Sequence, residues 1–190
     1  MDVYDFDGTL YEGDSTRDFL LWCARRFPRV ALTLPLTGIA AVACYGTKTR
    51  LLDKTSFKRV LYRFLVHVPD VEREVERFWE AHGRLIGGPC APKPGDLVIS
   101  AGPEFLMRGV CEARGLTLIG SRVDPHTGRV LGPNCSGAEK VVRLREVYPD
   151  VVVERFYSDS RNDDPLAALA REAWMVRDGQ LVPWPNGAEA

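Results

Sequence analysis

The chain has 190 residues, a length that suits one substantial domain with room for a smaller subdomain. Hydrophobic residues make up 45% and charged residues 27% of the sequence, which is ordinary for a soluble globular protein. The formal net charge of −1 gives no electrostatic basis for a nucleic-acid-binding surface, so we expect no nucleic acid partner.

The first predicted element is a strand over residues 2–6, and it runs into the sequence Asp5-Phe6-Asp7-Gly8-Thr9. Positions i and i+2 of a strand point the same way, so a strand that ends in this Gly turn directs both carboxylates to one spot beyond its tip. Two like charges this close together are costly unless a cation or a reaction uses them. The pair Asp5 and Asp7 therefore predicts a reactive or metal-binding site.

Residues 14–86 are predicted to be helical throughout, because apolar residues recur there at helical spacing behind residues that favour helix N-caps. Gly87-Gly88-Pro89 then marks a boundary, after which the character of the sequence changes. The candidate N-caps are Asp14 or Ser15, Thr55 or Ser56, and Asp70.

The stretch from Val30 to Thr47 contains 18 consecutive uncharged residues, which is the lower length limit for a membrane span. Pro35 and Gly38 interrupt it, and Arg29 and Lys48 flank it. We interpret the stretch as a buried or partly exposed pair of helices. A membrane-contacting surface is the less favoured alternative.

After the boundary, strands are expected over residues 96–100, 116–123, 151–157 and 174–176, with a short returning strand at 129–131. Helices are expected over residues 103–114, 137–147 and 165–173. This alternation predicts an α/β fold, a Rossmann-like parallel sheet with helices on both faces, and a small all-α cap inserted after the first strand. We expect residues 1–13 and 87–190 to form the core and residues 14–86 to form the cap.

Polar residues follow the predicted strands at their carboxyl ends, where open parallel sheets bind ligands. Ser100-Ala101-Gly102 ends one strand, and the run from Ser158 to Asp164 ends another. Lys140 is the only lysine between Ser100 and Asp159. Acids at about 4 Å repel each other by roughly 4 kcal/mol at an effective dielectric of about 20, so they need a cation, and all-oxygen ligands select Mg²⁺. A hydroxyl, a lysine and backbone N–H groups can bind phosphate, so the set predicts a phosphoryl-transfer site.

The chain has five cysteines, an odd number, and no two of them lie within four positions of each other. This spacing does not suit a zinc site, and we expect reduced thiols in a cytoplasmic protein. A strand that begins at residue 2 also leaves no room for a signal peptide, so none is expected.

These residues resemble the four motifs of the haloacid dehalogenase superfamily of phosphohydrolases. Asp5-Phe-Asp-Gly-Thr resembles motif one, Ser100 motif two, Lys140 motif three and Asp159-Ser-Arg-Asn-Asp163 motif four. Their order and approximate spacing agree with the family across essentially the whole chain. The helical insertion between motifs one and two is similar to the small cap of the phosphoserine-phosphatase-like branch.

The resemblance implies that Asp5 is the nucleophile, which forms an aspartyl-phosphate, and that Asp7 is the general acid and base. It implies Mg²⁺ held by Asp5, the backbone carbonyl of Asp7, and Asp159. Asp163 would support the metal through water or orient Lys140. The residues implied in phosphate binding are Ser100, Ala101, Lys140, Gly8 and Thr9.

The substrate is expected to be a small phosphate monoester, and its identity stays open. The alternatives are a lipid-linked or glycerophosphate substrate, a phosphomutase or phosphotransferase with the same aspartyl-phosphate, and a regulatory binding module with an inactive site. Dehalogenation is disfavoured because it needs no acid at position 7. Motif four also lacks the glycine-rich form common in phosphoserine phosphatases. The candidate cap contacts are Asp14, Arg17, Arg59 and Tyr62.

Overall fold

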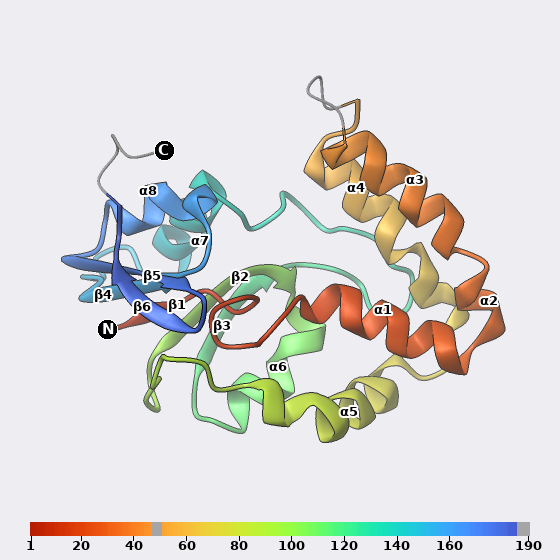
Figure 1. The fold of residues 1–190 in the computed structure, drawn as a ribbon, viewed down its shortest axis with the longest axis horizontal. Helices are drawn as coiled ribbons and strands as arrows, with labels where there is room; N and C mark the ends of the chain where they lie inside the picture. The colour runs from red at the N-terminus through yellow and green to blue at the C-terminus, as the bar shows by residue number, and fades with distance from the viewer. Residues whose placement is uncertain (47–50, 186–190) are drawn as a thin grey trace.

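The computed structural model describes residues 1–46 and 51–185, and these form a six-stranded sheet with helices around it (Figure 1). The strands are β1 (Val3–Tyr4), β2 (Leu97–Pro103), β3 (Thr117–Ser121), β4 (Arg155–Ser158), β5 (Glu172–Arg177) and β6 (Gln180–Pro183). Their order in the sheet is β3-β2-β1-β4-β5-β6, with β1 to β5 parallel and β6 antiparallel to β5. The predicted α/β class with a Rossmann-like parallel sheet is confirmed.

Strand β1 is short but central, and both of its residues are buried. Val3 pairs with Leu97 of β2 on one side and with Phe156 of β4 on the other. The sheet is apolar on both faces because helices cover both. Helix α6 (Glu104–Glu112) packs in one apolar cluster, and helices α7 (Ala138–Val147) and α8 (Asp164–Ala167) pack in another. This arrangement leaves the carboxyl ends of β1, β2 and β4 side by side.

The described residues between β1 and β2 form helices and turns, as predicted for residues 14–86. They are α1 (Ser15–Arg26), α2 (Pro28–Ala31), α3 (Leu34–Tyr45), α4 (Lys54–Leu61), α5 (Val71–His82) and the 3₁₀ turns η1 (Tyr62–His67) and η2 (Gly83–Leu85). Their apolar sides share a cluster that includes Phe19, Phe64 and Phe78. Figure 1 shows α3 and α4 standing out on the side away from β4, β5 and β6.

Aspartate side chains begin three of these helices. Asp14 accepts a hydrogen bond from the backbone N–H of Arg17, and Asp70 accepts one from Arg73. The predicted caps Thr55 and Ser56 are wrong, since Asp53 caps α4 and accepts from both of their N–H groups. An aspartate carboxylate reaches these donors as well as a hydroxyl does, so the helix begins two or three residues earlier than expected.

The predicted strand over residues 151–157 is mostly irregular, and β4 contains only Arg155–Ser158. Residues 152–154 make separate backbone hydrogen bonds to different segments instead of a continuous ladder. The Val152 carbonyl accepts from the amino terminus of Met1, the Val153 carbonyl accepts from the N–H of Arg171, and the N–H of Glu154 donates to the Met1 carbonyl. Val153 is buried, so the apolar run marks core packing rather than a continuous ladder. Periodicity alone does not separate these two cases.

The C-terminal third differs from expectation in three places. Residues 129–131 do not form a strand, and Val130 makes an isolated bridge to Val123. The helix expected over 165–173 ends at Ala167. Strand β6 was not predicted, although Asp178 and Gly179 (φ 51° and 73°) form the Asp-Gly turn that favours a two-residue hairpin.

Candidate active site

The carboxyl ends of three adjacent strands supply the residues of the site. β1 leads to Asp5 and Asp7, β2 carries Ser100, and β4 leads to Asp159 and the 3₁₀ turn η3 (Arg161–Asp163). Because β1 lies between β2 and β4, residues far apart in the chain meet at one edge of the sheet. This is the edge at which parallel α/β sheets bind ligands.

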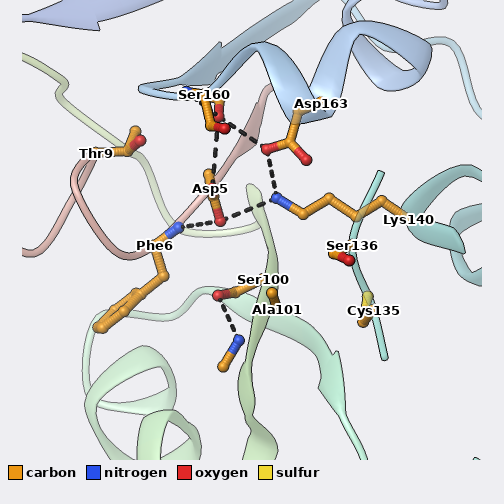
Figure 2. Close-up of polar contacts among 12 residues, drawn as sticks. Asp5, Phe6, Thr9, Ser100, Ala101, Cys135, Ser136, Lys140, Ser160 and Asp163 are labelled. Carbon is orange, nitrogen blue, oxygen red and sulfur yellow. Dashed lines mark hydrogen bonds and ion pairs between the residues drawn. The ribbon is translucent and has the colours of Figure 1, made fainter. Parts of the chain in front are cut away.

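Asp5 is the residue after β1, and its side chain is buried. One carboxylate oxygen, Oδ1, lies 3.0 Å from Nζ of Lys140 and accepts a hydrogen bond of 2.8 Å from the backbone N–H of Phe6 (Figure 2). Burial raises the pKa of Asp5 to about 6, although Lys140 opposes the shift. The contacts with Lys140 and with the N–H of Phe6 favour the ionised carboxylate and hold it in one orientation, as nucleophilic attack by a carboxylate would require.

Lys140 stands in the first turn of α7 and is fully buried. Its Nζ lies 2.7 Å from Oδ2 of Asp163, so the lysine bridges Asp5 and Asp163 (Figure 2). Ser158 Oγ donates to the same Asp163 oxygen at 2.8 Å. Burial alone would lower the pKa of Lys140, but the two carboxylates outweigh it and raise the pKa. The site thus holds a charged lysine in a fixed place.

The Asp7 carboxylate reaches into the helical block. Its Oδ1 accepts a hydrogen bond of 2.8 Å from the backbone N–H of Ser15, the first residue of α1. Burial raises the pKa of Asp7 to about 7, and the nearby Asp14 charge adds to the shift. A carboxyl group that titrates near neutral pH is suited to both giving and taking a proton.

Gly8, Thr9 and Asp159 connect the loop after β1 with the loop after β4. The backbone N–H of Asp159 donates to Thr9 Oγ1 at 3.1 Å. A Cβ atom at Gly8, whose φ is 72°, would lie 2.1 Å from Oδ2 of Asp159. The Asp159 carboxylate therefore lies directly over Gly8, and only a residue without a side chain leaves room for it.

Gly8→Ala is expected to lower the free energy of unfolding by roughly 1–2 kcal/mol, because an L side chain is strained at positive φ. Denaturant unfolding measures the effect. Gly83→Ala is the matched control, since Gly83 has a φ of −59° and a Cβ there would meet nothing within 4 Å. A Gly8→Ala protein as stable as the Gly83→Ala protein would contradict this reading of the turn.

Ser100 is buried, and its Oγ accepts a hydrogen bond of 3.0 Å from the backbone N–H of Gly102. It does not line the cavity of the site, whereas Ala101 and Gly102 do. The Ala101 carbonyl accepts hydrogen bonds from Ser121 Oγ and from Nζ of Lys58. The carboxyl end of β2 is thus fixed from several sides.

A cavity of about 600 Å³ opens between this edge of the sheet and the helical block. Of the four predicted cap contacts, Asp14 and Arg17 line it. The structure does not bring the other two to it: Arg59 is exposed on α4, and Tyr62 is buried in the core of the helical block. Consecutive residues of a helix point about 100° apart, so a prediction that is wrong by one position names a residue on a different helix face.

Among the cavity residues that prediction missed are two lysines, Lys54 and Lys58, which line the cavity from α4. Lys54 Nζ donates to Asn162 Oδ1 at 3.1 Å, and Lys58 donates to the Ala101 carbonyl. Burial lowers the pKa of Lys58 to about 8, although Asp7 and Asp14 oppose the shift. Their spacing could have revealed them. The chain has only five lysines, and two that are four positions apart lie on one face of a helix.

A divalent cation fits the charges of the site. Asp5 and Asp163 share the buried Lys140, whereas Asp7 and Asp159 form no ion pair within the described residues, so carboxylate oxygens remain that a cation can bind. In the described ranges, no three His, Cys, Asp or Glu side chains are already gathered for a metal ion. Magnesium is bound in proteins by one or two carboxylates plus water and substrate phosphate, so the donor set suits it.

Comparisons with known proteins place this chain among relatives. Its sequence matches the family model described as haloacid dehalogenase-like hydrolase over residues 3–168. It is 33% identical to Protein CicA of Caulobacter vibrioides over 188 residues. The alignment covers 90% of this chain and 82% of CicA.

Two solved structures share the fold. A protein of unknown function from Bordetella pertussis Tohama I aligns with a TM-score of 0.72 and 20% identity, over 91% of this chain and 87% of the other. A phosphoserine phosphohydrolase-like protein from Francisella tularensis subsp. tularensis SCHU S4 aligns with a TM-score of 0.50 and 13% identity, over 91% and 86%.

Proposed function

The chain belongs to the haloacid dehalogenase-like hydrolase family, and we propose that it is a Mg²⁺-dependent phosphatase that hydrolyses a phosphate monoester through an aspartyl-phosphate on Asp5. The observation that carries the proposal is the bridge from Asp5 through Lys140 to Asp163 at the carboxyl end of the sheet. It holds a carboxylate nucleophile next to a buried cation that can neutralise phosphate.

The first half-reaction joins Asp5 to the phosphoryl group. A carboxylate oxygen of Asp5 attacks phosphorus, the bond from phosphorus to the ester oxygen breaks, and Asp7 gives its proton to the leaving alcohol. In the second half-reaction, Asp7 takes a proton from water, the water oxygen bonds to phosphorus, and the bond to Asp5 breaks. Inorganic phosphate leaves, and both aspartates return to their starting states.

Phosphate charge is balanced by groups that are already fixed. Lys140 neutralises the phosphate oxygens, and Asp163 acts as a positioning residue, because it holds the lysine at 2.7 Å. The backbone N–H groups at the carboxyl end of β2, where Ala101 and Gly102 line the cavity, are proposed as further donors; the Ser100 hydroxyl does not line the cavity, and the Gly8 N–H already donates to the carbonyls of Tyr11 and Gly13. Such preorganised donors act most strongly where charge develops in the transition state.

Mg²⁺ is proposed to bind Asp5, the backbone carbonyl of Asp7, and Asp159. When bound, it neutralises the phosphate and reduces the repulsion between that dianion and the nucleophile. Asp159 is suited to this role because Gly8 has no side chain, which leaves room for the Asp159 carboxylate beside the loop after β1.

Residues 14–86 are proposed to act as a cap that closes over the site and excludes water while the aspartyl-phosphate forms. Lys54 and Lys58 support this role, since they reach from α4 to Asn162 in η3 and to the Ala101 carbonyl at the carboxyl end of β2. The five cysteines are buried free thiols, which supports the proposal of a reducing, cytoplasmic setting.

The proposed function is tested by a panel of phosphate esters, assayed for released phosphate with Mg²⁺ and with EDTA. The panel includes phosphoserine, sugar phosphates, glycerol 3-phosphate, an aryl phosphate and phosphatidic acid in detergent. We expect hydrolysis of at least one ester, a loss of at least about 10²-fold with EDTA, and recovery when Mg²⁺ is restored. No phosphate release from any ester, or release that is indifferent to EDTA, would overturn the proposal.

A further inference from the structure

One side of α3 is apolar and open to solvent. Leu32, next to α2, is 80% exposed, and Leu36, Ile39 and Val42 are 51%, 68% and 64% exposed. Their i, i+4, i+7 and i+10 spacing forms a stripe along one side of the helix, which we call the outer face. A contiguous exposed apolar surface on a folded protein marks an interaction site.

The charges that adjoin the outer face in the chain are positive. From Phe19 to Leu52 the sequence contains no aspartate and no glutamate. Arg25, in the last turn of α1, and Arg29, in α2, are exposed. An apolar stripe with basic residues and no acids complements the acyl chains and negative headgroups of an anionic bilayer.

Pro28–Tyr45 is the one segment of the described chain long and apolar enough to cross a membrane, with a mean hydropathy of 1.3 over 18 residues and 22% of it buried. The structure does not use it as a span. Thr37, Ala40 and Cys44 are buried, and α3 packs along α4. Within the described residues α3 is buried along one side and exposed along its outer face, so the helix suits the surface of a bilayer rather than its interior.

A third side of α3 forms a wall of the catalytic cavity. Leu34, Gly38 and Ala41 line the same cavity of about 600 Å³ as Asp5, Asp7 and Lys140 do. Cavities of this size hold ligands much larger than a phosphate group. These three residues are apolar, and Val42 is the member of the outer face that lies nearest to them around the helix. An apolar path therefore leads from the nucleophile to the outer face.

We infer that α3 lies on an anionic membrane surface through its outer face, and that the substrate is a lipid phosphate monoester whose acyl chains lie along Leu34, Gly38 and Ala41. This inference rests on the proposed function for its chemistry, but the membrane contact has an independent readout. The bond that breaks is the one between phosphorus and the lipid's ester oxygen, and the products are inorganic phosphate and the lipid alcohol.

Vesicle sedimentation tests the membrane contact. The protein is expected to sediment with vesicles of phosphatidylglycerol and phosphatidylcholine, and much less with phosphatidylcholine alone. The double variant Leu36→Glu/Ile39→Glu is expected to weaken this binding at least about tenfold, since it removes two apolar contacts and adds two negative charges. Val152→Glu is the matched control, because Val152 is an exposed valine before β4, at the opposite end of the sheet from the site.

Activity on two matched esters tests the substrate class. Phosphatidic acid in vesicles and glycerol 3-phosphate carry the same phosphoglycerol group with and without acyl chains. We expect phosphatidic acid to be hydrolysed at least about tenfold faster, and this preference to fall in Leu36→Glu/Ile39→Glu while an aryl phosphate is still hydrolysed at the wild-type rate.

The outcomes separate the two proposals. Vesicle binding without hydrolysis of any ester would overturn the proposed function and the lipid substrate, but not the membrane contact. Hydrolysis of soluble esters without vesicle binding would overturn the further inference alone. Self-association that the double variant abolishes, without vesicle binding, would assign the outer face to a second copy of the chain.

Discussion

Asp5→Asn is expected to yield a folded protein that hydrolyses phosphate esters at least about 10³-fold more slowly than the wild type. The amide cannot attack phosphorus as a carboxylate does. The fold should persist, because Lys140 keeps its partner Asp163 at 2.7 Å. Turnover of an aryl phosphate and the unfolding midpoint are the two measurements. In addition, acid-quenched wild type should carry a phosphoryl group on the peptide that contains Asp5, and the variant should carry none.

Asp2→Asn is the matched control for this variant. Asp2 is also a buried aspartate next to β1, but it lies at the opposite end of the strand and pairs with Arg155. Its replacement should leave turnover unchanged. Wild-type rates in Asp5→Asn, or an equal loss in both variants, would remove Asp5 from the role of nucleophile.

Lys140→Met is expected to reduce turnover at least about 10²-fold and to lower the free energy of unfolding by roughly 3–5 kcal/mol. The variant leaves Asp5 and Asp163 facing each other in a buried site without their cation. Kinetics with an aryl phosphate and denaturant unfolding of metal-free protein measure the two effects.

Two further variants separate charge balance from chemistry. Lys93→Met removes an exposed lysine and should change neither measurement. Lys140→Met/Asp163→Asn should recover part of the lost stability, because it removes one of the two unpaired carboxylates, and should not recover turnover. Full turnover in Lys140→Met would assign the lysine to folding alone.

Much of this arrangement could be predicted from the sequence because its signals are local. Asp5 and Asp7 two positions apart at a strand end, and Lys140 in a first helical turn, each follow from spacing alone, and the parallel fold then brings them together. The fold class was confirmed for the same reason, since alternating strands and helices leave few other arrangements.

The predictions that differ from the structure concern features that tertiary packing determines. The apolar run at 151–154 packs in the core without a ladder, and an apolar pattern cannot show which backbone groups will pair. Lys58 rather than Arg59 reaches the cavity, because the packing of α4 against α3 and η1, and not its own sequence, selects which helix face points there. Ser100 turns its hydroxyl toward Gly102, a local hydrogen bond that no spacing reveals.

The hydrogen bond from Ser15 to Asp7 has a consequence for how this protein tolerates sequence drift. The donor is a peptide N–H, a group that every amino acid except proline carries, so the hydrogen bond does not depend on the serine hydroxyl, and any residue small enough for this buried position would preserve it. Proline alone deletes it, and proline is well accepted at the first position of a helix, behind an extended residue such as Asp14. The position of the Asp7 carboxylate is thus fixed by a main-chain group and not by the side chain at position 15.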